Sequence, residues 1–312
     1  MIQHFRFGSP IRTDSVVQDI PVSSDAVPFL TADADGWVYT MAPDAIVYGL
    51  GEMPRGINKR GWHYVANNTD ESHHGENKVS YYGAHNFLLI DGGPGGDLFG
   101  VFVDFPGKVH YDIGYTVHDT LRFATEEPDY ELYILTGADP NDIAHQFRQL
   151  IGRSYIPPKW AFGLQQSRWG YKTAEDVREV ARQYKENDLP LDMICMDIDY
   201  MQDYADFTVN KQRFPDLAAL SAELKAQGIR LVPIIDAGVR IDPENPVCAE
   251  GLANGYFCTK ADGAPFVAAV WPGKAYFADF LRPEVREWFG RQYKALTDCG
   301  IEGFWNDMNE PA

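Results

Sequence analysis

The sequence predicts two domains of different fold class: a β-sandwich over residues 1–154, then the first four β/α units of a (β/α)8 TIM barrel over residues 155–312. Three observations support this prediction. Short β-type runs separated by turn residues fill the first half, strands alternate with helices in the second half, and carboxylates or aromatic residues follow most of those later strands.

In the first half, the clearest strand patterns are apolar runs at residues 46–49, 87–90, 99–103 and 130–135. The glycine-rich stretch 91–96 lies between two of these runs, and no helical pattern follows it. A phosphate-binding loop would lead into a helix, so this stretch is predicted to be a hairpin turn.

The domain boundary is marked by Pro157 and Pro158, because consecutive prolines end any regular element. The first two barrel strands are predicted at residues 161–165 and 191–198. The helix between them starts at Thr173, whose hydroxyl and the carboxylate of Asp176 form a capping pattern.

Two further units follow the same order of helix and strand. One helix starts at Asp216 and ends at Gly228, before a strand at residues 229–235. The next starts at Pro283 and ends at Gly300, before a fourth strand at residues 301–305. Residues 237–282 form an insertion with a hairpin pattern at Asp262-Gly263.

The residues that follow the strands favour a barrel over a dinucleotide-binding sheet. Asp197 and Asp199 come after the second strand, Asp236 after the third, and Asp307 after the fourth. Barrel enzymes collect their chemistry at the carboxyl ends of the strands. The first strand leads into residues 166–171, which lack the Gly-x-Gly-x-x-Gly pattern that a dinucleotide would require.

Charge and composition restrict the possible partners. With 27 Lys plus Arg against 45 Asp plus Glu, the net charge is −18, which repels nucleic acid and anionic membranes. The first 30 residues contain charges but no apolar core of a signal peptide, and the four cysteines show no Cys-x-x-Cys spacing. We therefore expect a cytoplasmic protein without a membrane span; the sequence carries no signal for its oligomeric state.

The most informative motif spans residues 303–311 and contains Asp307. Its carboxylate is expected at the barrel mouth beside Trp305, an indole on which a sugar ring can stack. Retaining hydrolysis of a glycosidic bond needs a nucleophilic carboxylate and a carboxylic acid about 5 Å apart. Asn306, Asn309 and Glu310 would supply the polar surroundings that keep a nucleophile ionised.

The motif at residues 305–311 resembles the signature of glycoside hydrolase family 31, and other segments are similar to that family in the same order. These segments are residues 48–52, 156–161, 166–171, 196–201, 207–208 with 214–215, 235–236 and 270–273. The resemblance implies an α-glucosidase that releases terminal α-linked glucose from oligosaccharides, with Asp307 as nucleophile and no cofactor.

The resemblance also implies roles for other residues. Asp197 would bind hydroxyls of the sugar, Asp236 would shape the pocket floor, and Trp169 would lie at the leaving sugar. Asp70 would reach the substrate from a sandwich loop. The remaining pocket residues implied by the resemblance are Ile198, Ile234, Trp271, Trp305 and Met308.

Structural roles are the alternative at several of these positions. Asp197 would form an ion pair, for example with Arg168; Asp199 would be structural; and Trp271 and Trp305 would be core aromatics. For Asp70 and Trp169 the assignment depends on loop position alone. His63, His73, His74 and Glu76 lie close in sequence, but their spacing favours a polar surface loop over a metal site.

The sequence leaves three functions open: an α-glucosidase, an α-xylosidase or transglycosylase of the same family, and a non-catalytic carbohydrate-binding relic. The family's general acid lies on a later strand than the fourth, so we expect the 312-residue chain to be a truncated barrel without that acid.

The missing acid predicts that the purified 312-residue polypeptide does not hydrolyse an aryl α-glucoside. The release of the aryl alcohol, measured by absorbance against a protein-free blank, is the test. Turnover above the blank would contradict this expectation.

Overall fold

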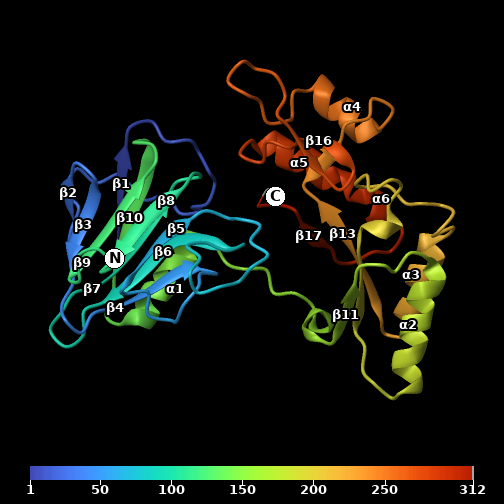
Figure 1. Cartoon of the computed structure of the whole chain (residues 1–312), viewed down its shortest axis with the longest axis horizontal. Helices are drawn as coiled ribbons and strands as arrows, with labels where there is room; N and C mark the ends of the chain where they lie inside the picture. Colours follow the sequence, from blue (N-terminus) through green and yellow to red (C-terminus); the bar gives the residue numbers. More distant parts are fainter. Residues whose placement is uncertain (311–312) are drawn as a thin grey trace. The chain divides into compact units, whose positions relative to one another are not determined.

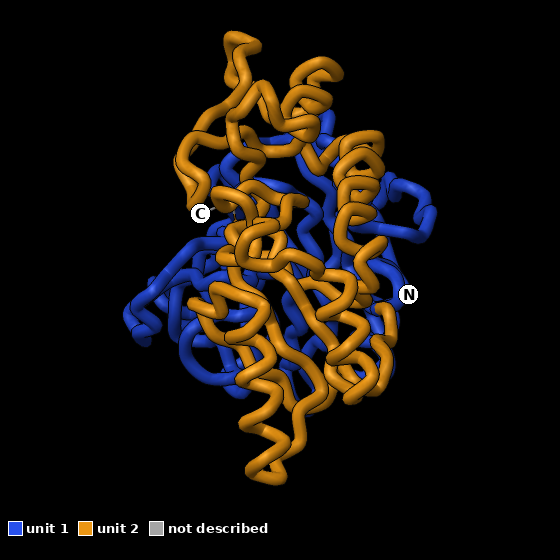
Figure 2. Tube along the Cα trace, turned by 90° about the vertical axis from the view of Figure 1, so that its right-hand side faces the viewer, with its two compact units in different colours: residues 1–154, 311 blue, residues 155–310, 312 orange. Residues whose placement is uncertain are grey.

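The computed structural model describes residues 1–310 of the chain. Within that range it divides into two compact units, Met1–Ser154 (unit 1) and Tyr155–Glu310 (unit 2), shown in separate colours in Figure 2. The predicted architecture is confirmed: unit 1 is a β-sandwich, and unit 2 contains half of a parallel barrel sheet.

Unit 1 contains two five-stranded antiparallel sheets. One has the strand order β1-β10-β7-β6-β4 and the other β2-β3-β9-β8-β5. The first sheet is formed by β1 (Ile2–Phe7), β10 (Tyr130–Thr136), β7 (Leu98–Asp104), β6 (Ala84–Asp91) and β4 (Ile46–Gly51). The second sheet is formed by β2 (Thr31–Asp33), β3 (Gly36–Thr40), β9 (Thr120–Thr125), β8 (Val109–Ile113) and β5 (Trp62–Ala66).

Alternation along β10 shows how the first sheet is covered on both faces. Leu132 and Ile134 belong to the core between the sheets, whereas Tyr133 and Leu135 pack toward helix α1 (Pro140–Leu150). Successive side chains of a strand point to opposite faces, so one strand serves two apolar layers. Figure 1 shows α1 lying against this sheet.

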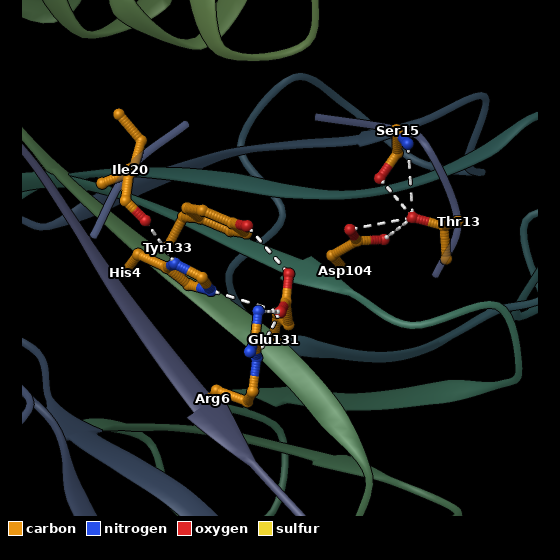
Figure 3. Close-up of polar contacts among 8 residues, drawn as sticks. All are labelled: His4, Arg6, Thr13, Ser15, Ile20, Asp104, Glu131 and Tyr133. Atoms are coloured by element: carbon orange, nitrogen blue, oxygen red, sulfur yellow. Dashed lines mark hydrogen bonds and ion pairs between the residues drawn. The ribbon is translucent and has the colours of Figure 1, made fainter. Parts of the chain in front are cut away.

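Polar contacts hold the irregular segment 8–22 against the same sheet (Figure 3). Thr13 Oγ1 donates to both carboxylate oxygens of Asp104 at 2.8 and 2.9 Å, and His4 Nδ1 lies 2.8 Å from the carbonyl oxygen of Ile20. Nearby, the Glu131 carboxylate accepts from Arg6 and from the hydroxyl of Tyr133. The bonds of Thr13 to Asp104 and of His4 to Ile20 attach the segment to the strands.

Unit 2 is built on a four-stranded parallel sheet of order β11-β12-β13-β17. Its strands are β11 (Gln165–Arg168), β12 (Met193–Met196), β13 (Arg230–Asp236) and β17 (Trp305–Asp307). The helices that follow in sequence are α2 (Ala174–Glu186), α3 (Leu217–Ala226), α5 (Pro283–Gln292) and α6 (Lys294–Thr297). The apolar faces of these helices and of the strands form one core that includes Val177, Leu220 and Trp288.

The predicted helix starts are confirmed. Thr173 accepts from the amide of Asp176, and the Asp176 carboxylate accepts from the amide of Thr173, so α2 begins with a complete capping box. Asp216 caps α3 in the same way through the amide of Ala219, and Gly228 follows that helix at φ +87°.

The insertion between β13 and α5 forms a separate antiparallel sheet of order β14-β16-β15. It contains β14 (Gly238–Arg240), α4 (Pro246–Ala253), β15 (Val267–Val270) and β16 (Gly273–Phe277). The turn predicted at Asp262-Gly263 is present, with Gly263 at φ +82° and the amide of Lys260 donating to the carbonyl of Ala264.

Two strand predictions were wrong in position. Residues 159–162 form a 3-10 helix, η1 (Lys159–Phe162), because the amides of Ala161 and Gly163 bond back to the carbonyls of Pro158 and Trp160; the strand starts at Gln165. The fourth strand starts at Trp305 instead of residue 301. Its hydrogen-bonded register with β13 covers only Ile234 to Asp236, and Gly303 before it lies close to the edge of the Trp160 indole.

Two further boundaries also differ from the prediction. The apolar run 191–198 contains β12, but its last residue begins a second 3-10 helix, η2 (Ile198–Tyr200). The helix predicted from Pro283 to Gly300 is divided at Tyr293 into α5 and α6. No helix within residues 1–310 is long and apolar enough to cross a membrane.

The capping box predicts a stability effect. Thr173→Ala removes the side-chain acceptor for the first turn of α2 and is expected to lower the free energy of unfolding by about 1 kcal/mol. Urea denaturation monitored by circular dichroism measures this change in the free energy of unfolding. Thr259→Ala, at an exposed position in the insertion, is the matched control and should change stability by less than about 0.5 kcal/mol. Equal effects of the two substitutions would contradict the capping role.

Candidate active site

Three carboxylates meet at the carboxyl edge of the parallel sheet. Asp197 follows β12 directly, Asp236 is the last residue of β13, and Asp307 is the last residue of β17. Asp236 and Asp307 are register partners in neighbouring strands. The strands therefore place three acidic side chains from distant parts of the sequence side by side.

Burial and the negative charge of neighbouring carboxylates raise the pKa of Asp236 and of Asp197. The side chain of Asp236 is only 1% exposed, and its pKa is raised to about 7, first by burial and then by the negative charges of Asp307 and Asp197. Burial is also the largest cause of the raised pKa of Asp197, followed among the raising effects by Asp307 and Asp199. One oxygen of Asp197 accepts from the amide of Ile198 at 2.7 Å, which favours its charged form.

The strand that carries Asp307 is fixed by its neighbours. The indole Nε1 of Trp305 donates to the carbonyl of Met196 at 3.2 Å, across to the end of β12. The hydroxyl of Tyr293, at the break between α5 and α6, donates to Asn306 Oδ1 at 2.9 Å. Met308 adopts φ +56°, so the chain turns sharply after Asp307. Pro311, the last residue of the motif, lies outside the described residues.

The other predicted residues of unit 2 occupy different environments. Ile198 and Ile234 are buried in the core beside the carboxylate-bearing positions, and Trp305 is partly buried against the same core. Trp169, directly after β11, and Trp271, in the turn between β15 and β16, are 66% and 55% exposed. Exposed indoles on loops have a free face for ligand contact, unlike core aromatics.

Asp70 belongs to unit 1, in the loop between β5 and β6. It is exposed, and one of its carboxylate oxygens accepts from the hydroxyl of Tyr82 at 2.9 Å. The contacts of this residue are local to its own loop.

Asp199 has a structural environment. Its side chain is 4% exposed, and one oxygen lies 3.6 Å from Arg213 Nη1. The ion pair near the second strand thus involves Asp199, whereas the sequence had suggested one for Asp197, the candidate sugar-binding residue.

Sequence reasoning missed two residues beside the cluster, Tyr200 and Asp206. The hydroxyl of Tyr200 donates to the carbonyl of Ile234 at 2.8 Å, and Asp206 Oδ1 accepts from the amide of Asp236 at 2.9 Å. Asp206 lies in a loop without strand or helix periodicity, so neither pattern nor spacing pointed to it.

The histidines of unit 1 do not converge. The ring of His63 packs against Tyr115, His74 packs against Tyr81 and Tyr82, and His73 lies 3.9 Å from Glu71. Within the described part of the chain, no group of three or more histidine, cysteine or acidic side chains is arranged to hold a metal ion.

A cavity of about 590 Å³ lies along the parallel sheet. Its lining includes Trp160, Met193, Cys195, Arg230 and Trp305. Arg230 is the first residue of β13, whereas Trp305 pairs with Ile234 near the end of that strand, so the cavity runs along the sheet, and none of the three carboxylates lines it. The carboxyl edge remains the candidate site for chemistry.

Known proteins match both units. Residues 154–312 match the TIM-barrel domain of glycosyl hydrolases family 31, and residues 21–112 match the glycosyl hydrolase 31 N-terminal galactose mutarotase-like domain. The first match covers more than half of the chain and includes all three clustered carboxylates.

Relatives with known names agree with these matches. The chain is 42% identical to alpha-glucosidase 2 of Bacillus thermoamyloliquefaciens over 85% of its length and 33% of that protein, and 31% identical to alpha-xylosidase 1 of Arabidopsis thaliana over 87% of its length and 30% of that protein. A family 31 dextranase of Flavobacterium johnsoniae, solved in complex with isomaltotriose, superposes with a TM-score of 0.79 at 26% identity, covering 92% of this chain and 35% of the dextranase. The chain thus spans about a third of the length of these relatives.

The raised pKa of Asp236 predicts a pH-dependent stability. Because its folded pKa of about 7 lies above the usual aspartate value of 3.8, the folded state binds more protons, and stability is lost as the pH rises between these values. Asp236→Asn removes this contribution and should reduce the loss between pH 4 and 7 by roughly 2 to 4 kcal/mol.

Urea unfolding at pH 4.5, 6 and 8 measures this difference. The control is Asp188→Asn, at an exposed position after α2, which should leave the pH profile of the parent protein unchanged. A profile of Asp236→Asn parallel to that of the parent protein would contradict the prediction.

Proposed function

This chain belongs to glycosyl hydrolase family 31, and we propose that it provides the nucleophile and part of the glucose pocket of a retaining α-glucosidase. Such an enzyme hydrolyses terminal α-linked glucose from oligosaccharides. The observation that carries the proposal is the meeting of Asp197, Asp236 and Asp307 at the carboxyl edge of the parallel sheet, where barrel enzymes bind substrate.

We assign the attack on the anomeric carbon to Asp307. Its strand is held by the Trp305 indole and the Tyr293 hydroxyl, so the carboxylate starts from a fixed position, which reduces the entropy lost on reaching the transition state. Attack forms a covalent glycosyl–Asp307 ester while the bond to the leaving oxygen breaks, and water then hydrolyses the ester. None of residues 1–310 is assigned the role of the general acid, which protonates the leaving oxygen.

We assign sugar binding to the neighbouring residues. A half-buried Asp197 carboxylate accepts hydrogen bonds from sugar hydroxyls, and Asp236 with Ile198, Ile234, Trp305 and Met308 shapes the pocket. The exposed faces of Trp169 and Trp271 suit stacking against sugar rings. For the exposed carboxylate of Asp70, contact with the substrate is proposed from the family resemblance alone. The other roles follow from the family resemblance together with the burial and exposure of each side chain.

An α-xyloside is the alternative substrate, favoured by the identity to an α-xylosidase. A xylosyl unit lacks the hydroxymethyl group of glucose, so the two substrates differ in how far they fill one side of the pocket.

We also propose a reducing, cytoplasmic location, which is consistent with the four cysteines being free thiols.

Covalent labelling tests the nucleophile without requiring a general acid. A fluorinated α-glucosyl fluoride carries a leaving group that departs without protonation, and its ring fluorine slows hydrolysis of the ester. We expect mass spectrometry of the protein expressed from its own gene to find the label on Asp307. The label should be lost in Asp307→Asn and kept in the control Asp262→Asn, which alters an exposed turn residue.

Two results would change the proposal. A label on another carboxylate, or its persistence in Asp307→Asn, would contradict the role of Asp307. Faster labelling by the corresponding xylosyl fluoride would keep the nucleophile and change the substrate to an α-xyloside.

A further inference from the structure

Strand β13 extends past the end of its neighbour β12. The register between them ends at Met196 opposite Pro233, whereas β13 continues to Asp236 and pairs there with β17 on its other side. The polar backbone groups of Ile234 and Asp236 that face the β12 side consequently lack a strand partner. Buried backbone groups without partners are costly, so something else must bond them.

Two side chains take the place of the missing strand. The Tyr200 hydroxyl donates to the Ile234 carbonyl at 2.8 Å, and the Asp206 carboxyl accepts from the Asp236 amide at 2.9 Å. Alternate residues of a strand point their backbone groups to the same side, so these two bonds occupy successive ladder positions. Together they fix the last residues of β13, which end at Asp236.

The loop that supplies Asp206 is held in an unusual conformation. Asp203, Tyr204 and Phe207 all have φ between +51° and +63°, which is unfavourable for residues other than glycine. The ring of Phe207 packs edge-on against Phe289 and Tyr293, with centroids 5.1 and 5.3 Å away. Such local strain persists where surrounding contacts impose it, and here it brings a carboxyl group beneath the cluster.

Asp206 fits this place as a neutral acid. Its side chain is buried, and burial together with the negative charge of Asp236 raises the pKa of Asp206 well above its usual range. Its second oxygen has no hydrogen-bond partner within residues 1–310, which an ionised carboxylate would tolerate poorly. A protonated Asp206 still offers an oxygen to the Asp236 amide and adds no charge beside three other carboxyl groups.

We propose that Asp206, acting as a neutral hydrogen-bond acceptor on the Asp236 amide, is a positioning residue that fixes the floor of the sugar pocket. This inference rests on the proposed function, because Asp236 is the floor of that pocket only if the carboxyl edge binds the sugar. Asp206 acts through Asp236 and makes no contact with the substrate itself.

The experiment compares two substitutions at Asp206 in the protein expressed from its own gene. Asp206→Asn keeps the shape and the acceptor oxygen, whereas Asp206→Ala removes the acceptor. Asp203→Asn is the control, because its side chain is 64% exposed in the same loop. The affinity for 1-deoxynojirimycin, a basic glucose mimic, is measured by calorimetry across pH 5 to 8, and amide hydrogen exchange of Asp236 is measured without ligand.

We expect Asp206→Ala to weaken binding roughly 10-fold and to speed exchange of the Asp236 amide at least about 10-fold. Asp206→Asn and Asp203→Asn should keep both quantities within about 3-fold of the parent protein, and Asp206→Asn should leave the pH profile of binding unchanged. If Asp206→Ala does not fold, Tyr200→Phe removes the adjacent bond to Ile234 and should weaken binding in the same direction.

The outcomes separate the two proposals. Failure of the parent protein to bind the probe would contradict the proposed pocket, while the exchange data would still report on the Asp206 bond. Normal binding and exchange in Asp206→Ala would overturn the positioning role. If Asp206→Asn weakens binding and speeds exchange of the Asp236 amide as much as Asp206→Ala does, the charge of Asp206 matters. That result would contradict its action as a neutral acceptor.

Discussion

The burial of carboxyl groups close to one another is the constraint at the carboxyl edge of the parallel sheet in unit 2. Parallel strands bring the carboxyl ends of β12, β13 and β17 to one edge, and each end carries an aspartate. Three negative charges in a poorly hydrated place would oppose folding. The repulsion is relieved because Asp236 has a raised pKa of about 7 and is readily protonated, whereas Asp307 is only partly buried. The proposed nucleophile, Asp307, and Asp236, a carboxyl group that protonates near neutral pH, are thus positioned by one backbone arrangement.

The same edge is closed by bonds from side chains to the backbone. Tyr200, Asp206 and Trp305 each bond a main-chain group at the end of β12 or β13. These bonds take the place of the regular ladder where the strand lengths differ. All three come from unit 2 itself, so the geometry of the cluster depends on the barrel half and its loops.

The sequence predicted the features that local physics determines. Capping residues such as Thr173 and Asp216 have a fixed relation to the next turn, and apolar periodicity located β13 within one residue. Prediction from the sequence failed where long-range contacts determine the structure of a segment. The segment 301–304 contains the apolar residues Ile301 and Phe304, yet it lies outside the ladder, and Gly303 lies close to Trp160. Asp307 was found through its motif, whereas Asp206 required knowledge of which strand end lacked a partner.

The insertion after β13 forms its own small sheet, separate from the parallel sheet. β14 starts two residues after Asp236, yet the sheet it forms with β15 and β16 is hydrogen-bonded separately from the barrel strands. Mutations in the turn that carries Trp271 can therefore accumulate without disturbing the parallel ladder. The insertion still shares one hydrophobic core with the barrel strands through residues such as Val239 and Phe257, so variation is best tolerated in its exposed turns. Relatives named for glucosides and for xylosides are in keeping with variation in such turns.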